Sequence, residues 1–304
     1  MTNQDRSTAP PAPEPAATVA DWIAGARPRT LPAAVAPVLA GTAVAAHLDG
    51  AVWWKALLAL VVSLALQVAV NYANDYSDGI RGTDDDRVGP MRLVGSGRAT
   101  PSAVKRAAFA AFGVAGVAGL VLAATTAWWL VAVGVVCIVA AWFYTGGKNP
   151  YGYIGLGEVM VFVFFGLVAV IGTTFVQTET FEVDALWCGI GIGALSCAVL
   201  VTNNLRDIPT DTVSGKRTLA VRLGDARTRW FYVALVAVAT VMVVVLAANT
   251  DWLVLVGLLF LVKAAPACRT VLGGAGGPAL IPVLAATGIS QLWWAGCVAV
   301  GLLV

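Results

Sequence analysis

Residues 67–84 read Gln67-Val-Ala-Val-Asn71-Tyr-Ala-Asn74-Asp75-Tyr-Ser-Asp78-Gly-Ile-Arg81-Gly-Thr-Asp84, and they close an apolar run that begins near residue 52. Asn71, Asp75 and Asp78 are spaced i, i+4, i+7, so a helix places them on one face. Polar side chains after an apolar run of this length are typical of a membrane helix that ends in a polar site. We therefore predict a transmembrane helix with an amide and two carboxylates at its end.

A second stretch repeats this arrangement. An apolar run over residues 185–204 leads into Asn203-Asn204-Leu-Arg206-Asp207-Ile-Pro209-Thr-Asp211. Asn203, Asp207 and Asp211 are spaced i, i+4, i+8, and Asn204 can serve the same face at i, i+3, i+7. Pro209 lacks a backbone donor and disfavours a helical residue before it, so we expect a bend there. Two matched clusters favour one shared site over two ordinary solvated loops.

The composition is that of a membrane protein. Of the 304 residues, 59% are hydrophobic and only 12% are charged, whereas soluble domains average about 25% charged residues. Apolar segments cover residues 31–47, 52–73, 104–125, 127–145, 154–176, 185–204, 229–248, 252–271 and 279–303. The predicted fold is all-α, a polytopic membrane helical bundle with about nine transmembrane helices. We expect one transmembrane domain over residues 21–304, after a disordered tail of residues 1–20 that is rich in proline and alanine.

The basic residues predict the orientation in the membrane. With the amino-terminus inside, every Lys and Arg among the 19 except Lys55 and Lys263 falls on the inner side. The outer side then carries the acidic residues Asp49, Glu179, Glu182, Asp184 and Asp251. The amino-terminus and the two loops that follow the aspartate clusters are therefore expected in the cytosol.

The two clusters together predict a site for a metal-bound diphosphate. Four aspartates at a membrane surface repel one another unless cations lie between them. Magnesium takes hard oxygen ligands and is usually held by a few carboxylates together with substrate phosphates. Arg and Lys side chains between the acids can bind the remaining diphosphate oxygens. We predict that the catalytic, Mg²⁺-binding residues are Asp75, Asp78, Asp207 and Asp211, and that substrate is bound by Asn71, Asn74, Arg81, Asn203, Asn204, Arg206 and Lys216.

The other reactive residue types argue against several alternative chemistries. His47 is the only histidine and ends a predicted helix, so a histidine base is not expected. The five cysteines lie inside apolar segments without the paired spacing of a metal site. The expected partners are the lipid bilayer and a lipid diphosphate, and no nucleic acid is expected.

These motifs resemble the UbiA superfamily of intramembrane aromatic prenyltransferases. The first motif of that family reads roughly N-D-x-x-D-x-x-x-D, which Asn74, Asp75 and Asp78 match. Its last position falls on Gly82 and an acid follows only at Asp84, which resembles the menaquinone branch, the 1,4-dihydroxy-2-naphthoate polyprenyltransferases. Other stretches similar to that branch are Arg27-Pro-Arg-Thr-Leu-Pro, Arg87-Val-Gly-Pro-Met-Arg, Tyr151-Gly-Tyr-Ile-Gly-Leu-Gly-Glu, Asn203-Asn-Leu-Arg-Asp-Ile and Gly215-Lys-Arg-Thr-Leu.

The resemblance implies a bundle around a central cavity that opens laterally to lipid in the cell membrane. It also implies transfer of the prenyl chain of a polyprenyl diphosphate to 1,4-dihydroxy-2-naphthoate, with loss of CO₂ and diphosphate, to give demethylmenaquinol for menaquinone biosynthesis. Asp84 would join the Mg²⁺ ligands, and Lys148, which follows Tyr144, would contact the diphosphate. Glu158, a carboxylate at the start of an apolar segment, would lie beside the aromatic substrate or pair with Lys148 or a nearby amide.

Other functions fit parts of the sequence. Within the same family, the acceptor could instead be a hydroxybenzoate, homogentisate or haem. A cation transporter would use similar clusters, but it would more often place its carboxylates near the middle of the membrane. CDP-alcohol phosphotransferases carry a D-G-x-x-A-R motif, which Asp78-Gly79-Ile-Arg81 does not continue. Neither the prenyl chain length nor the oligomeric state follows from the sequence.

Overall fold

The computed structural model describes residues 17–82 and 91–304, and these ranges contain helices and no strand. Asp84 and Arg87 lie outside the described residues. The first half consists of α1 (Val19–Gly25), η1 (Pro28–Thr30), α2 (Pro32–His47), α3 (Trp53–Gly79), α4 (Pro101–Thr125), α5 (Leu130–Phe143) and η2 (Tyr151–Ile154). There follow α6 (Gly157–Val161), the π-helical η3 (Phe162–Val168), α7 (Ala169–Thr178), α8 (Val183–Val213), α9 (Leu219–Leu223), α10 (Asp225–Asn249), η4 (Trp252–Phe260), α11 (Leu261–Leu272), η5 (Gly277–Ala279) and α12 (Leu280–Leu303).

The predicted all-α membrane bundle is confirmed. Seven helices in the described ranges are long and apolar enough to cross a bilayer, and an eighth span forms if the pair Val19–Thr30 and Pro32–His47, which bends by 51°, counts as one. Three of the seven are composite, because α6, η3 and α7 run together, as do η4 and α11, and η5 and α12. The shorter apolar helix α5 supplies a further element where the sequence predicted a span over 127–145. About nine helices therefore cross the bundle, in rough agreement with the prediction.

Helices α3 and α8 extend well beyond the predicted apolar segments. Helix α3 continues to Gly79, so Asp75 and Asp78 are helical residues, as their spacing predicted, and Asn74 is helical as well. Helix α8 continues through Pro209 to Val213, so the expected bend at this proline does not end the helix. Of the apolar stretch of α8, 72% is buried inside the bundle, against 33–50% for the other spans. This burial stabilises α8 and offsets the one backbone hydrogen bond that the proline removes.

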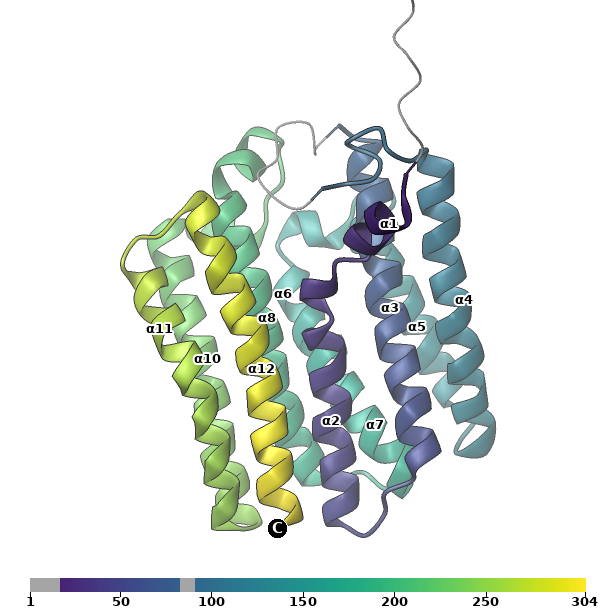
Figure 1. Cartoon of the computed structure of the whole chain (residues 1–304), viewed down its shortest axis with the longest axis vertical. Coiled ribbons are helices and arrows are strands. Elements are labelled where there is room, and N and C mark those ends of the chain that lie inside the picture. Colours follow the sequence, from purple (N-terminus) through teal and green to yellow (C-terminus); the bar gives the residue numbers. More distant parts are fainter. Residues whose placement is uncertain (1–16, 83–90) are drawn as a thin grey trace, which may run out of the picture.

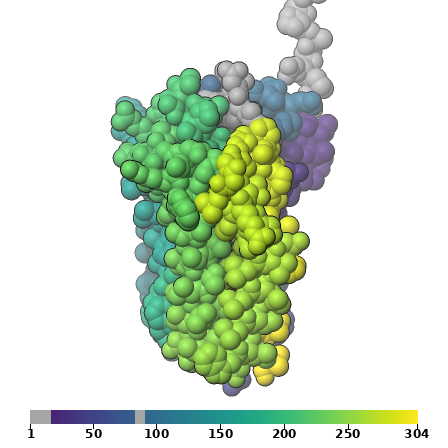
Figure 2. Space-filling model, turned by 90° about the vertical axis from the view of Figure 1, so that its left-hand side faces the viewer, coloured from purple at the N-terminus to yellow at the C-terminus, as the bar shows by residue number. Residues whose placement is uncertain are grey.

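Helix α8 is the central element of the bundle (Figure 1). It packs against α10, α12 and η3, and the largest hydrophobic core lies between these helices. The contact with η3 requires glycine, because a Cβ at Gly166 would lie 2.5 Å from the carbonyl oxygen of Gly189. Helices α3 and α4 form a second packed pair on the other side of the molecule, and the carboxy-terminal helices cover the face seen in Figure 2.

Both aspartate clusters lie at one end of the bundle, which we call the site end. The ends of α3 and α8, the loop of residues 91–100 and the short helices α1 and α9 gather there (Figure 1). The opposite end carries the connections 48–52, 126–129 and 179–182 together with the carboxy-terminus. Lys55, which departs from the predicted charge pattern, lies near that opposite end and pairs with Glu179 at 3.3 Å. The chain is a multi-pass membrane protein.

Candidate active site

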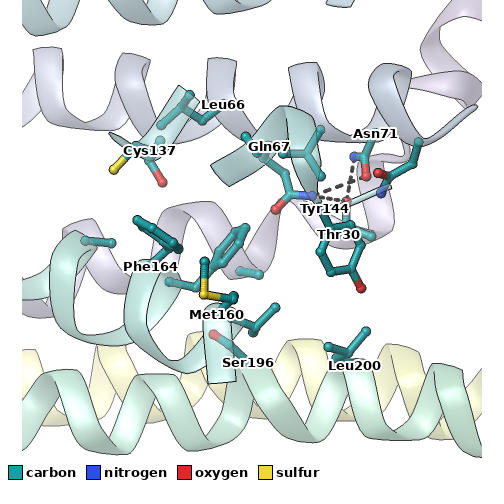
Figure 3. A pocket seen from close by; sticks show the side chains of 18 of the residues that line it. Thr30, Leu66, Gln67, Asn71, Cys137, Tyr144, Met160, Phe164, Ser196 and Leu200 are labelled. Atoms are coloured by element: carbon teal, nitrogen blue, oxygen red, sulfur yellow. Dashed lines mark hydrogen bonds between the residues drawn. The ribbon is translucent and has the colours of Figure 1, made fainter. Parts of the chain in front are cut away.

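A cavity of about 400 Å³ opens between the helices and reaches the site end. Residues of α2, α3, α5, η3, α7 and α8 line it, and Figure 3 shows Leu66, Gln67 and Asn71 of α3 across the cavity from Ser196 and Leu200 of α8. At the site end the lining is polar, with the side chains of Asn71, Asn74, Asp78, Arg92, Asn203, Asn204, Asp207, Asp211 and Lys216. Toward the opposite end it is apolar, with Val38, Ala59, Leu122, Leu130 and Val176. The shape and lining suit an amphiphile with a charged head and a long hydrocarbon tail.

Asp78 lies at the centre of the polar region and is 3% exposed. Its Oδ1 accepts a hydrogen bond of 2.5 Å from the Tyr153 hydroxyl and lies 3.6 Å from the Lys216 ammonium. Its Oδ2 lies 3.4 Å from the Arg92 guanidinium. Two cations and a phenol therefore surround this carboxylate.

Asp75 has a different environment although it is only three residues away. It is 1% exposed and does not line the cavity. Its two oxygens accept hydrogen bonds from the backbone N–H groups of Leu93 and Val94, at 2.7 and 3.0 Å. The carboxylate thus anchors the loop that carries Arg92. The helical face that meets the cavity is made of Asn71, Asn74 and Asp78, with spacing i, i+3, i+7, and not of the expected set that includes Asp75.

Two predicted diphosphate ligands point away from the cavity. The Arg81 guanidinium donates to the carbonyl oxygens of Thr145 and Gly147 and stacks on the Tyr153 ring, 5.3 Å from its centroid. Lys148 is exposed on the same connection and is not part of the cavity lining. Asn74 does line the cavity, and its Oδ1 accepts a hydrogen bond of 2.7 Å from the Thr145 hydroxyl.

The second cluster lies on the facing wall. Asn203, Asn204, Asp207 and Asp211 all line the cavity, so the predicted helical spacing does bring these four together. Arg206 holds Asp207 in a bidentate pair of 2.7 and 2.8 Å, and it also donates to Asn203 Oδ1 at 2.8 Å. This paired geometry is strong because the planar guanidinium matches both carboxylate oxygens.

Glu158 lies behind Asn204 rather than in the cavity itself. It is 4% exposed, and its Oε1 accepts a hydrogen bond of 2.9 Å from the Asn204 amide. Asn204 in turn lines the cavity. Of the pairings considered from the sequence, the structure has the one with a nearby amide.

The connection between α5 and α6 contributes tyrosines that the sequence analysis did not single out as site residues. Tyr144, Tyr151 and Tyr153 all line the cavity. The Lys216 ammonium lies 4.5 Å from the centroid of the Tyr153 ring, which therefore contacts cations from both clusters. Burial raises the pKa of Tyr151, so its phenol stays protonated and donates to the Ala140 carbonyl at 2.7 Å. Aromatic residues in a short connection carry no periodic signal that would reveal such a role.

The donor set of the polar region fits a hard divalent cation. Asp78, Asp207 and Asp211 supply carboxylate oxygens from two facing helices, and Asn74 and Asn203 add amide oxygens. Within residues 17–82 and 91–304, however, no three Asp, Glu, His or Cys side chains already form a metal-binding group. Instead, the Lys216 ammonium pairs with Asp78 of α3, and the Arg206 guanidinium pairs with Asp207 of its own helix α8. Binding of a cation would require these basic side chains to turn toward another anion.

The sequence is similar to curated prenyltransferases. A model described as the UbiA prenyltransferase family matches residues 34–272. The chain is 59% identical over 283 residues to the 1,4-dihydroxy-2-naphthoate octaprenyltransferase of Mycobacterium tuberculosis, which covers 93% of this chain and 97% of that protein. It is 40% identical over 228 residues to the protein of the same name from Escherichia coli, with 70% and 72% covered.

The fold is similar to solved structures at low sequence identity. A UbiA homolog from Aeropyrum pernix K1 superposes with a TM-score of 0.69 at 13% identity, over 93% of this chain and 98% of that one. A UbiA homolog from Archaeoglobus fulgidus, solved with DMAPP and Mg²⁺ bound, gives 0.63 at 13% identity over the same shares. Because the family model covers most of the chain and the curated relatives align along it, the chain belongs to the UbiA prenyltransferase family.

Proposed function

We propose that this chain transfers a polyprenyl group from a polyprenyl diphosphate to 1,4-dihydroxy-2-naphthoate, releasing diphosphate and CO₂ and forming demethylmenaquinol in menaquinone biosynthesis. The observation that carries this proposal is the 59% identity, along nearly the whole of both chains, to a protein named 1,4-dihydroxy-2-naphthoate octaprenyltransferase. The cavity supports it independently, because its polar head and apolar length match a polyprenyl diphosphate. In the membrane, the site end faces the cytosol, where the water-soluble acceptor is found.

The diphosphate binds in the polar region between α3 and α8. Lys216 and Arg206 are long enough to leave their present carboxylate partners and bind diphosphate oxygens, which carry more charge. Asn74 and Asn203 offer amide groups to the same oxygens. Asp84, which lies outside the described residues, is a further candidate from the motif. Lys148 lies on the connection after α5, and Arg81, which follows α3, donates to two carbonyls of that connection.

Magnesium is the cofactor we propose, with Asp78, Asp207 and Asp211 as the ligands nearest the cavity and Asp84 as a further candidate from the motif. Asp75 holds the loop at Leu93 and Val94 instead. When bound, Mg²⁺ withdraws charge from the diphosphate and so favours its departure from the allylic carbon. The carboxylates hold the charge of the Mg²⁺ ion at the site end. The apolar walls, which include Phe164 and Leu200, keep water away from the allylic carbon. Glu158 orients the Asn204 amide toward the substrate.

The test is a reconstitution of the purified protein in lipid with Mg²⁺, a polyprenyl diphosphate and an acceptor. With 1,4-dihydroxy-2-naphthoate we expect one diphosphate and one CO₂ released per prenylated product, measured by a coupled diphosphate assay and by release of labelled carboxylate. 4-Hydroxybenzoate and homogentisate serve as parallel acceptors. Faster turnover of either one, or equal turnover in excess chelator, would contradict the proposal.

A further inference from the structure

A hydrogen-bonded network lines the cavity deeper than the aspartates. Gln67 on α3 donates through Nε2 to the Thr30 hydroxyl at 3.2 Å and to Asn71 Oδ1 at 3.3 Å. Asn71 donates through Nδ2 to the Ala26 carbonyl at 2.8 Å and to the Thr30 hydroxyl at 3.0 Å. Gln67, Asn71 and Thr30 all line the cavity, and Figure 3 shows the three side chains joined together.

The direction of every bond in this network is determined by backbone carbonyls, which can only accept. The Ala26 carbonyl requires the nitrogen of Asn71, which leaves Asn71 Oδ1 to face Gln67. The Thr30 hydroxyl donates to the Arg27 carbonyl at 2.9 Å, so it can only accept from the two amides. Both constraints require the nitrogen of Gln67 to face the network. Reversing either amide would set two acceptors or two donors against each other.

The carbonyl oxygen of Gln67 is therefore the group that the network turns toward the cavity. The side chain is 6% exposed, and no described residue donates to Oε1. In Figure 3 this oxygen lies on the side of the cavity where Met160 is found. Because Gln67 lines the cavity, this oxygen is open to a hydrogen-bond donor from a ligand there. Because Gln67 offers only an acceptor there, the ligand must bring an O–H or N–H group.

The depth of Gln67 indicates which part of the substrates it meets. Gln67 precedes Asp78 by eleven residues on the same helix, which places its backbone roughly 16 Å deeper along the axis. A diphosphate head at Asp78 does not reach that far. The Gln67 side chain, however, reaches back to Asn71, which lies seven residues or roughly 10 Å from Asp78 along the axis. At that level we expect the aromatic ring that meets the first prenyl carbon. Prenyl chains have no hydrogen-bond donor, whereas a dihydroxynaphthoate has two hydroxyl groups.

We propose that Gln67 Oε1, held in place by Thr30 and Asn71, accepts a hydrogen bond from a ring hydroxyl of the aromatic acceptor and so orients the ring toward the allylic carbon. This inference rests on the proposed function. The bond also draws electron density from the hydroxyl into the ring, which favours attack by the ring carbon. Gln67 is thus a binding residue for the acceptor and not for the prenyl diphosphate.

The test compares Gln67→Met with the unaltered protein in lipid. Methionine nearly preserves the volume and removes the acceptor oxygen. We expect the KM for 1,4-dihydroxy-2-naphthoate to rise about ten-fold, with the KM for the prenyl diphosphate and its Mg²⁺-dependent binding unchanged. An unchanged acceptor KM would overturn the proposal. The control is Gln177→Met on α7, a buried glutamine whose amide bonds Val52, Thr42 and Thr173 away from the substrate and should not alter the acceptor KM.

Two acceptor analogues, each lacking one hydroxyl, identify the contact. As competitive inhibitors, 1-hydroxy-2-naphthoate and 4-hydroxy-2-naphthoate should respond differently to Gln67→Met. The analogue without the contacting hydroxyl should inhibit both proteins equally, whereas the other should lose about ten-fold in the variant. Equal losses for both analogues would indicate an altered cavity shape and overturn the proposal.

A second variant covers the case in which Gln67→Met does not fold. Thr30→Val removes the hydroxyl that fixes the Gln67 amide, and it should raise the acceptor KM alone. A rise in the prenyl diphosphate KM instead would contradict the inference. Failure of the unaltered protein to prenylate dihydroxynaphthoate would count against the proposed function, and would be seen before any variant is compared.

Discussion

The two aspartate clusters look alike in sequence but differ in how their carboxylates are used. On α3, Asp78 faces the cavity and contacts Tyr153, Arg92 and Lys216. Asp75 instead binds a loop, because its carboxylate accepts hydrogen bonds from two backbone N–H groups. On α8, Asp207 and Asp211 both face the cavity. The difference arises because the loop of residues 91–100 brings the backbone N–H groups of Leu93 and Val94 to Asp75.

This contrast shows that equal spacing does not imply equal roles. An aspartate whose two oxygens are already bound by backbone donors has little capacity left for a metal ion or a cation. An aspartate held by lysine or arginine side chains can exchange those partners for substrate, because the side chains can move. The predictions below separate these two kinds of aspartate.

The largest effects are expected at the cavity-facing aspartates. Asp78→Asn and Asp207→Asn should each lower prenyl transfer by a factor on the order of 10² to 10³, because each removes charge that holds the cation at the diphosphate. Turnover measured across a Mg²⁺ titration checks this. Asp251→Asn at the opposite end, where Asp251 caps η4 through the Leu253 N–H, is the control and should retain full activity. Loss of less than ten-fold at Asp78 would contradict the assignment.

Asp75→Asn should act through the loop and not through the metal. We expect a loss of stability of about 1–3 kcal/mol, because an amide can accept at one oxygen only and leaves a buried N–H without its charged partner. Hydrogen exchange should accelerate at Leu93 and Val94, the two residues whose amides the carboxylate binds. The Mg²⁺ concentration for half-maximal activity should not change. If Asp75→Asn shifted this Mg²⁺ concentration as much as Asp78→Asn does, Asp75 would be a metal ligand. The proposed difference between the two aspartates would then be wrong.

Tyr153→Phe tests the link between the clusters. The variant loses the hydrogen bond to Asp78 but keeps the ring on which Lys216 and Arg81 rest, so we expect turnover to fall by about ten-fold. Tyr153→Leu removes the ring as well and should raise the KM for prenyl diphosphate further. If the two variants behaved alike, the ring contact with Lys216 would have no part in binding.

The smallest effect on activity is expected at Pro209, which lies within the α8 cluster and has no counterpart in the α3 cluster. Helix α8 already continues past this residue, so Pro209→Ala should leave activity within about two-fold and raise thermal stability by up to about 3 kcal/mol. Melting temperature and turnover in the same lipid check both expectations. A drop in activity of more than ten-fold would mean that the proline positions Asp211.

Much of the fold and part of the site could be predicted from the sequence. Apolar length determines which segments cross the membrane, and basic residues indicate which loops lie together, because both depend on composition and not on packing. The spacing of Asn203, Asp207 and Asp211 also held, since a helix imposes it locally. By contrast, the direction taken by Asp75 depends on Leu93 and Val94, which approach it only through the folded loop.

The sequence by itself determined that this protein is a helical membrane bundle with two carboxylate clusters at one end, because helix period and hydrophobic length are local properties. Only the tertiary structure decided which polar groups line the cavity. Asp75, Arg81 and Lys148 face elsewhere, while Tyr153 and Gln67 line the cavity. The physical reason is that a buried polar group takes its role from the partners that reach it, and those partners come from segments far apart in the chain.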